Sequence, residues 1–282
     1  MIAYTALLKP RVVVMVLAAC ATGLLLASGG RPGGGLALVT LLGTALMAGG
    51  ACALNQVLER TADSLMERTR RRPVPSGVIP PAHALAFGVL LVLAGCALLA
   101  VRANLLTAFL GLLSAFLYVL VYTPAKRLSW TCTPIGAVSG AIPPLMGWAA
   151  VAGRIEAWAW VLFGMLFLWQ HVHFYAIAWM NREDYRRAGF RVLPVVEPAG
   201  AGTFRQIVLA AAALIPVASL LGGTGLVGPA WRWGTPLAGL AMLIAAVGFS
   251  RSRSRRAARF TALALVAYLP LVLWLVVMDL RP

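Results

Sequence analysis

The chain has 282 residues, of which 61% are apolar and only 11% are charged. Soluble domains average about 25% charged residues, so this composition excludes an ordinary soluble domain and indicates a polytopic membrane protein. The net charge of +16 does not indicate a nucleic-acid partner, because no soluble basic domain is present and basic cytoplasmic loops account for it.

Nine apolar stretches of the sequence are each about 20 residues long, the length that a helix needs to cross a bilayer. Glycine and proline clusters separate several of them, as at 31–35, 80–81 and 222–229. We therefore expect an all-α polytopic membrane protein of about nine transmembrane helices, with residues 1–282 in a single domain. The expected spans are approximately 10–28, 36–58, 82–101, 104–122, 134–152, 157–179, 204–222, 232–250 and 260–279.

The basic residues divide unevenly between the two sides of this arrangement. The N-terminus and the loops after the second, fourth, sixth and eighth spans hold 19 of the 24 lysines and arginines. Because basic residues are retained in the cytoplasm, we expect these segments on the cytoplasmic side of a bacterial-type inner membrane, with the C-terminus outside. The four cytoplasmic loops would cover about 59–81, 123–133, 180–203 and 251–259. The other side would receive Arg31, Arg102, Arg154, Arg232 and Arg281.

The four cysteines stand singly in or beside apolar stretches, and none belongs to a CxxC pair. We expect them to be small buried hydrophobic residues rather than zinc or redox groups. Leu17-Ala18-Ala19-Cys20 resembles a lipoprotein cleavage box, but the apolar stretch continues past the cysteine. The first span is therefore expected to remain uncleaved.

Polar and charged residues gather where the second span ends. Asn55, Glu59 and Asp63 follow one another at intervals of four residues, which places their oxygen-bearing side chains on one face of a helix. A run of arginines comes within about one further turn, at Arg68, Arg70, Arg71 and Arg72. Carboxylates bind hard cations and guanidinium groups bind phosphate, so this stretch predicts a magnesium–diphosphate site at the membrane surface.

A second polar row runs along the sixth span and emerges from its end. Its members share one helix face because three or four residues separate each from the next: Gln170, His173, Ile177, Asn181 and Asp184. Polar groups within a span usually face a cavity or a partner. His173 could accept a proton, face a haem or form an interhelical hydrogen bond, and the last is the commonest role for such a residue alone. His171 points away from this row and is assigned a structural role.

The region between these two clusters contains a basic pair and an interrupted span. Lys126 and Arg127 belong to a short loop after the fourth span, where position alone favours helix anchors. In the fifth span, Gly136 and Gly140 form a small-residue face that allows another helix to approach closely. Pro143-Pro144 should then kink this span, and irregular backbone at this depth is tolerated where it is packed in protein or lines a cavity such as a substrate chamber.

The most specific sequence feature is a series of motifs in a fixed order. They are Asn55-x3-Glu59-x3-Asp63, Arg68-Thr-x-x-Arg72-Pro73, Tyr122-Thr-Pro-x-Lys126-Arg127, Gly140-Ala-Ile-Pro-Pro144, Trp169-Gln170-x-x-His173-Phe174, Asp184-Tyr185, Val192-Leu-Pro194 and Tyr268-Leu-Pro270-Leu271. Together they resemble the motifs of the UbiA-type intramembrane prenyltransferases, and within them those of the branch that farnesylates haem. The resemblance covers about 55–280, nearly the whole chain.

Three positions depart from the common pattern of that family. Glu59 stands where many bacterial members have aspartate, although glutamate keeps the charge. The loop that carries Lys126 is one residue shorter than the common bacterial form. The second DxxxD motif of the wider superfamily is reduced to Asn181 and Asp184, as it is in the haem-specific branch.

The resemblance implies a UbiA-type helical bundle around a central cavity. It implies transfer of a farnesyl group from farnesyl diphosphate to a vinyl group of haem b, giving haem O for haem–copper terminal oxidases. Mg²⁺ would be held by Asn55, Glu59, Asp63 and Asp184. The diphosphate would be bound by Arg68, Arg72, Lys126 and Arg127. The haem would contact Gln170 and His173, and His173 is also the candidate for handling a proton. The lipid bilayer would surround the protein, and the next enzyme of haem A synthesis or an oxidase assembly factor would be a partner.

Other functions are compatible with parts of the sequence. A UbiA-type prenyltransferase that acts on an aromatic quinone precursor would keep the first acidic motif, whereas the row from Trp169 to His173 favours haem. A membrane haem-binding protein would keep His173 without needing three oxygen-bearing residues on one helix face. A transporter would more often show inverted repeats and polar groups near the midplane, and the charged clusters here lie at helix ends.

Overall fold

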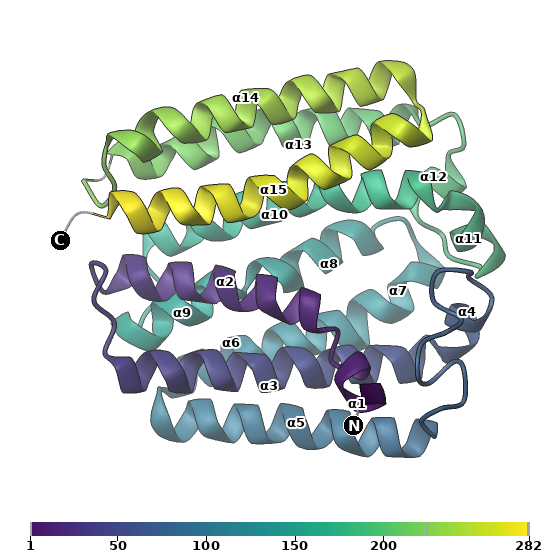
Figure 1. Ribbon diagram of the computed structural model, residues 1–282, viewed down its shortest axis with the longest axis horizontal. Helices are drawn as coiled ribbons and strands as arrows, with labels where there is room; N and C mark the ends of the chain where they lie inside the picture. Colours follow the sequence, from purple (N-terminus) through teal and green to yellow (C-terminus); the bar gives the residue numbers. More distant parts are fainter. Residues whose placement is uncertain (1, 224, 281–282) are drawn as a thin grey trace.

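The computed structural model describes residues 2–223 and 225–280, which form a bundle of long helices that run roughly alongside one another (Figure 1). Within these residues nine helical spans are long and apolar enough to cross a membrane, and no β-strand is present. The expected all-α fold of nine spans is therefore confirmed. The spans are α2 (Pro10–Ala27), α3 (Gly34–Leu58), α5 (Pro81–Arg102), α6 (Leu105–Phe116) continued by α7 (Thr123–Leu128), α8 (Cys132–Ala141) continued by α9 (Pro143–Ala152), α10 (Ala157–Met180), α13 (Ala201–Ser219), α14 (Pro229–Ser252) and α15 (Arg255–Asp279).

Short helices complete the described residues. They are α1 (Ile2–Leu7), α4 (Arg60–Ser64), α11 (Arg182–Arg187), α12 (Leu193–Val196), the π-helical turn η1 (Leu117–Tyr122) and the 3₁₀ turn η2 (Leu220–Gly223). Several helix ends follow directly from the sequence. Pro81 and Pro229 open α5 and α14, where proline needs no hydrogen-bond donor. Gly153, at φ 68°, ends α9 in the left-handed region that glycine adopts freely.

The outer surface of the bundle is apolar. Leu38, Leu90 and Trp233 are 68%, 65% and 70% exposed, and many other large apolar side chains resemble them. Contiguous apolar surface on this scale is unfavourable in water and matches the hydrocarbon of a bilayer. The chain is therefore an integral membrane protein.

The charge-rich segments gather at one end of the bundle. Figure 1 shows α1, α4, α11 and α12 towards the same end as the turn between α14 and α15, while the α2–α3 and α13–α14 turns lie at the other. This arrangement matches the two sides inferred from the basic residues. Arg281, the last of the five basic residues expected on the other side, and the C-terminus itself lie outside the described residues.

The fourth span differs from the expectation. It does not end near residue 122 but continues through the π-helical turn into α7, so Lys126 and Arg127 lie on a helix and not in a loop. Thr123 helps to form the wider turn, because its Oγ1 donates to the Tyr118 carbonyl oxygen at 2.8 Å, five residues back. π-Helical turns occur frequently at functional sites.

The fifth span breaks where the proline pair predicts. α8 ends at Ala141 and α9 begins at Pro143. The small-residue face of α8 receives side chains from two neighbours. A Cβ atom on Gly136 would lie 2.7 Å from the Tyr122 ring, and one on Gly140 would lie 2.1 Å from Gln170 Oε1. The expected close approach at these glycines is confirmed.

Helices α2 and α9 are in backbone contact. A Cβ atom on Gly147 would lie 1.9 Å from the Cys20 carbonyl oxygen, and one on Gly23 would lie 2.1 Å from that of Pro144. Lipid tails are as apolar as the helices, so helix association in a membrane depends on such close packing. This contact holds the N-terminal span, and with it the turn that precedes α2, against the middle of the bundle.

We predict that Gly147→Ala lowers the free energy of unfolding by about 2 kcal/mol or more, because the new methyl group forces α2 away from α9. The thermal midpoint of the purified protein in detergent micelles measures this change. Gly248→Ala in α14 is the matched control, since its Cβ atom would have no neighbour within 4 Å. Equal midpoints for the two variants would contradict the proposed contact.

Candidate functional site

Three buried polar residues lie where α3 ends. Asn55, Glu59 and Asp63 are 1%, 5% and 0% exposed. The helix is interrupted at Glu59, and α4 begins at the next residue. Hydrogen bonds nevertheless bridge the interruption, from Glu59 N to the Asn55 carbonyl oxygen (2.9 Å) and from Asp63 N to that of Glu59 (2.7 Å). The four-residue spacing therefore keeps its helical geometry through the break.

Each of these three side chains is paired with a cation. Lys9 Nζ donates to Asn55 Oδ1 at 2.9 Å. Lys126 Nζ lies 2.8 Å from Glu59 Oε1, and Arg72 Nη1 donates to Asp63 Oδ2 at 2.7 Å. The three cations come from the turn before α2, from α7 and from the segment after α4. Each buried charge thus has a partner, which a low-dielectric site requires.

Lys9 is a site residue that the sequence analysis missed. It occupies the turn between α1 and α2 at φ 50° and ψ 64°, a conformation that residues other than glycine rarely adopt. Its Nζ also lies 3.5 Å from the Tyr118 hydroxyl. Gln56 holds this turn in place by donating to the Leu7 carbonyl oxygen at 3.1 Å. The available signal was a lysine directly before the proline that opens an apolar span, but its backbone conformation cannot be read from sequence.

Burial and neighbouring charges shift two ionisable groups of the site. Burial lowers the pKa of the Lys9 ammonium to about 8, and the positive charges of Arg72 and Lys126 act in the same direction. Burial raises the pKa of the Glu59 carboxyl, but the charge of Lys126 outweighs it, so the net pKa lies below its ordinary value. At neutral pH, Glu59 is a carboxylate and Lys9 is an ammonium that loses its proton easily.

The π-helical turn positions the partner of Asn55. Asn55 Nδ2 donates to Thr123 Oγ1 at 3.0 Å, while its Oδ1 accepts from Lys9. Both ends of the amide are therefore engaged, and a metal ion bound by Oδ1 must share or replace the Lys9 contact. The wider turn between α6 and α7 brings Thr123 to this position.

Lys126 links the site to the second charge-rich loop. Its ammonium lies 4.5 Å from the centre of the Tyr122 ring and 5.5 Å from that of Phe190. The Arg191 backbone N–H donates to the Lys126 carbonyl oxygen at 2.6 Å. An apolar cluster of Ala62, Met66, Ala188 and Phe190, with Tyr185 against it, joins the same two loops. The α4 region and the segment after α11 therefore pack against each other.

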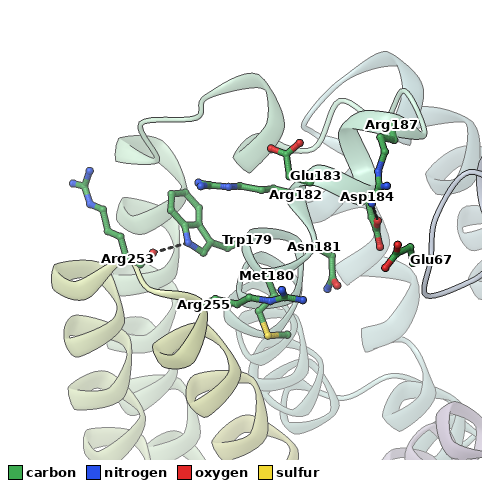
Figure 2. Close-up of a pocket in the computed structure, with 10 residues that line it drawn as sticks. All are labelled: Glu67, Trp179, Met180, Asn181, Arg182, Glu183, Asp184, Arg187, Arg253 and Arg255. Carbon is green, nitrogen blue, oxygen red and sulfur yellow. Dashed lines mark hydrogen bonds and ion pairs between the residues drawn. The ribbon is translucent and has the colours of Figure 1, made fainter.

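The structure places Asp184 differently from the other predicted metal ligands. Asp184 forms an ion pair with Arg187 and lines a pocket with Glu67, as Figure 2 shows. Asn55, Glu59 and Asp63 do not line that pocket. Asn181 Nδ2 donates to the Ile177 carbonyl oxygen at the end of its own helix, at 2.8 Å. Among the described residues, no three His, Cys, Asp or Glu side chains lie close enough together to hold a metal ion.

The remaining predicted residues fall into two groups. Arg68 and Arg127 are exposed and form no ion pair within the described part of the chain. Gln170 is buried and donates to the carbonyl oxygens of Ala137 (3.3 Å) and Leu166 (3.1 Å). Its amide nitrogen thus bonds to α8 through Ala137 and to its own helix, α10, through Leu166.

The two histidines of α10 have different environments. His171 Nδ1 lies 2.8 Å from the Phe167 carbonyl oxygen, which agrees with the structural role expected for it. His173 stacks on Trp169, with ring centres 5.1 Å apart and an interplanar angle of 8°. Its Nδ1 is buried without a hydrogen-bond partner. A buried polar atom without a partner is rare, so His173 is the member of the polar row that is best placed to bind a ligand.

The end of α3 also retains an oxygen atom that a cation could bind. Asp63 Oδ1 is buried and has no hydrogen-bond partner, while its Oδ2 pairs with Arg72. Carboxylate and amide oxygens are the ligands that Mg²⁺ prefers. The oxygen atoms present here therefore fit a hard cation whose other ligands are phosphate oxygens.

Comparisons with known proteins agree on one family. The sequence model described as "UbiA prenyltransferase family" matches residues 16–277. A protein of Solibacter usitatus named "Protoheme IX farnesyltransferase" is 46% identical over 245 residues, covering 87% of this chain and 84% of that protein. A protein of Symbiobacterium thermophilum with the same name is 46% identical over 253 residues, covering 89% and 84%.

Solved structures share the fold at low identity. A structure described as that of digeranylgeranylglyceryl phosphate synthase has a TM-score of 0.82 at 16% identity, covering 98% of this chain and 97% of that one. A UbiA homologue from Archaeoglobus fulgidus bound to GPP and Mg²⁺ has a TM-score of 0.68 at 14% identity, covering 98% and 99%. Both similarities concern the fold.

We predict that Lys126→Met lowers the free energy of unfolding by about 3 kcal/mol, because it leaves the Glu59 carboxylate buried without a counter-charge. Glu59→Gln in the same chain should recover part of this loss, since no charge then remains unpaired. Thermal midpoints in detergent measure both effects. Arg186→Met is the control, because it breaks a pair whose side chains are 68% and 67% exposed and should change stability by less than about 1 kcal/mol. Similar losses for Lys126→Met and Arg186→Met would argue against a buried pair.

Proposed function

The chain belongs to the UbiA prenyltransferase family, and from this membership we propose that it transfers a farnesyl group from farnesyl diphosphate to a vinyl group of haem b, giving haem O. The family establishes prenyl transfer, and the relatives named protoheme IX farnesyltransferase supply the choice of substrates. The observation that carries the proposal is the row of three buried oxygen-bearing residues with three cations beside them, at the end of a membrane-spanning helix.

The proposed diphosphate site is the end of α3. Mg²⁺ bound by Asn55, Glu59, Asp63 and Asp184 would neutralise the negative charge that develops on the leaving diphosphate. Arg72, Lys126 and Lys9 already lie beside these side chains, and can turn from them to the diphosphate oxygens once a metal ion replaces them. Arg68 and Arg127, which are exposed, would reach the outer oxygens of the same group.

The reaction follows from charge development on both substrates. The bond between farnesyl C1 and the diphosphate oxygen breaks, and the bond electrons leave with the diphosphate. The terminal carbon of the vinyl group attacks the allylic cation, and water adds to the cation formed beside the porphyrin ring. His173 Nδ1, which lacks a partner, is our candidate for accepting the proton that this water releases or for contacting the haem. The surrounding apolar helices exclude other water from the allylic cation.

The proposal extends to the cellular setting. The protein would lie in a bacterial-type cytoplasmic membrane with its N-terminus and the site on the cytoplasmic side, and with its C-terminus outside. The uneven distribution of basic residues supports this orientation. Its product would serve haem–copper terminal oxidases, through the next enzyme of haem A synthesis or an oxidase assembly factor.

The direct experiment incubates the purified protein in lipid with farnesyl diphosphate, haem b and Mg²⁺. Mass spectrometry should show a haem that has gained a farnesyl group and a hydroxyl group. EDTA should stop the reaction and added Mg²⁺ should restore it. An aromatic quinone precursor, offered in place of haem, should remain unmodified. Farnesylation of that compound alone would transfer the assignment to the alternative acceptor.

Asp63→Asn should reduce the rate of farnesyl transfer by at least about a hundredfold, because the variant keeps the shape of the side chain but removes a charge that holds the metal. Its helical content should stay close to that of the wild type. Its thermal midpoint should fall, because Arg72 loses its counter-charge, so the rates are compared below the midpoint of the variant. Glu156→Gln, at a carboxylate that pairs with Arg154 and lies outside both the α3 cluster and the pocket of Asp184, is the control and should retain activity. Full turnover by Asp63→Asn would overturn the role of the first motif.

The pKa of Lys9 predicts a pH dependence. As the pH rises through about 8, the Lys9 ammonium loses its proton and can no longer balance the diphosphate charge, so transfer should slow. Arginine keeps its proton in this range, so Lys9→Arg should shift the alkaline limb of the rate profile to higher pH. Steady-state rates measured from about pH 6 to about pH 10, on both sides of the Lys9 pKa of about 8, test this. Superimposable profiles for the two proteins would exclude Lys9 as the titrating group.

A further inference from the structure

A polar cavity opens at the end of the bundle where the charge-rich segments meet. It has a volume of about 320 Å³, and Figure 2 shows its lining from the end of α10, α11, the α14–α15 turn and the segment after α4. Ligand pockets range upward from about 300 Å³, so a cavity of this size accommodates one edge of a large ligand rather than all of it.

Two arginines on this lining have no carboxylate partner. Arg182 and Arg255 form no ion pair with any described residue, whereas Arg187 is paired with Asp184. The Arg182 guanidinium is held over the Trp179 ring, with 4.7 Å between its central carbon and the ring centre. Figure 2 shows Arg255 reaching across the cavity towards Met180 and Asn181. No ion pair within the described residues therefore neutralises these two side chains. The lining also carries the carboxylates of Glu67, Glu183 and Asp184, and its four arginines exceed these three carboxylates by one charge.

The position of Arg255 at the start of a helix adds further positive charge to the cavity. It is the first residue of α15, and the first turn of that helix has no acidic residue. A helix N-terminus already carries partial positive charge, so a cation is unfavourable there unless an anion binds nearby. The neighbouring Arg253 is different, because its Nη1 donates to the Ala199 carbonyl oxygen at 2.9 Å and its own carbonyl oxygen accepts from Trp179 Nε1 at 2.9 Å. Arg253 is thus engaged by the fold, and Arg255 is available to a ligand.

One face of α10 leads from the cavity into the bundle. Met180 lines the cavity two turns after His173, which corresponds to a rise of about 10 Å. Trp169, on which His173 stacks, donates through Nε1 to the Leu265 carbonyl oxygen at 2.8 Å. This face of α10 therefore lies against α15, the helix that Arg255 begins. The unpartnered His173 nitrogen and the unpaired arginines flank the same pair of helices.

We propose that Arg182 and Arg255 bind the two propionate carboxylates of the porphyrin substrate, an inference that rests on the proposed use of haem b. Guanidinium groups form charge-assisted, often bidentate, hydrogen bonds with carboxylates. The propionates of haem b lie on the edge of the ring opposite the vinyl groups. Binding them in this cavity keeps the charged edge at the membrane surface, where charge is tolerated, and lets only the apolar edge with its vinyl groups enter the bundle.

The test compares haem b with its dimethyl ester, in which both carboxylates are uncharged. Optical titration of the full-length protein in phosphatidylcholine nanodiscs should give a Kd for haem b at least about tenfold below that for the ester. Arg182→Gln and Arg255→Gln should each raise the Kd for haem b by about tenfold and leave the Kd for the ester unchanged. Equal affinities of the wild type for the two compounds would refute the proposal.

Two controls separate this site from general surface charge and from lipid binding. Arg256→Gln removes an exposed charge from the same turn outside the cavity lining, and should leave both Kd values unchanged. A loss equal to that of Arg255→Gln would reduce the effect to non-specific attraction and overturn the proposal. Repeating the titration with phosphatidylglycerol in the nanodiscs identifies a lipid headgroup as the ligand if the preference for haem b disappears. A preserved preference supports the carboxylate site.

The same variants separate this inference from the proposed reaction. If the wild type farnesylates haem b, the double variant Arg182→Gln/Arg255→Gln should raise the KM for haem b and leave the KM for farnesyl diphosphate unchanged. A change in the KM for farnesyl diphosphate alone would place both arginines in the diphosphate site instead. If the wild type produces no farnesylated haem, the proposed function fails, whereas the difference in Kd between haem b and its ester still decides the carboxylate site.

Discussion

Buried charge at the end of an apolar helix needs a counter-charge, and this requirement organises one end of the molecule. Asn55, Glu59 and Asp63 lie at the end of α3, and each has a cation from another segment beside it. The Glu59 and Asp63 carboxylates could not remain buried alone, because an unpaired charge in a low-dielectric environment is strongly destabilising, and the buried Asn55 amide needs hydrogen-bond partners. The pairs therefore join α3 to the N-terminal turn, to α7 and to the segment after α4. They fix the positions of these four segments relative to one another.

Two backbone irregularities make this pairing possible. The π-helical turn between α6 and α7 lets Thr123 accept from Asn55 and leaves Lys126 on a helix that faces Glu59. The left-handed conformation of Lys9 turns its ammonium towards α3. Such conformations persist only where surrounding contacts hold them in place. For Lys9, these are the contact of α2 with α9 and the hydrogen bond from Gln56 to Leu7.

Hydrophobic length and basic residues predicted the nine spans and the grouping of the charged segments, because both depend on local composition. The four-residue spacing predicted the row at the end of α3, since that row is also local. The partners of the row were not predictable. The sequence does not show that Lys9 adopts a left-handed conformation or that the helix widens before Thr123, because both result from tertiary contacts. The resemblance also groups Asp184 with the row; in the structure Asp184 and Glu67 line a pocket that the row does not line, and the shared metal site stays a prediction.

The one-to-one pairing at the end of α3 has a consequence for the order of events in a catalytic cycle. Lys9, Lys126 and Arg72 face two carboxylates and one amide, so the three cations exceed the carboxylates by one charge. In the proposed reaction, an anionic metal–diphosphate complex would take these cations from their partners in the protein. When the diphosphate leaves with its metal, the three original contacts would re-form. The side chains of Asn55, Glu59 and Asp63 would thus compete with the diphosphate for the same cations, which would favour product release.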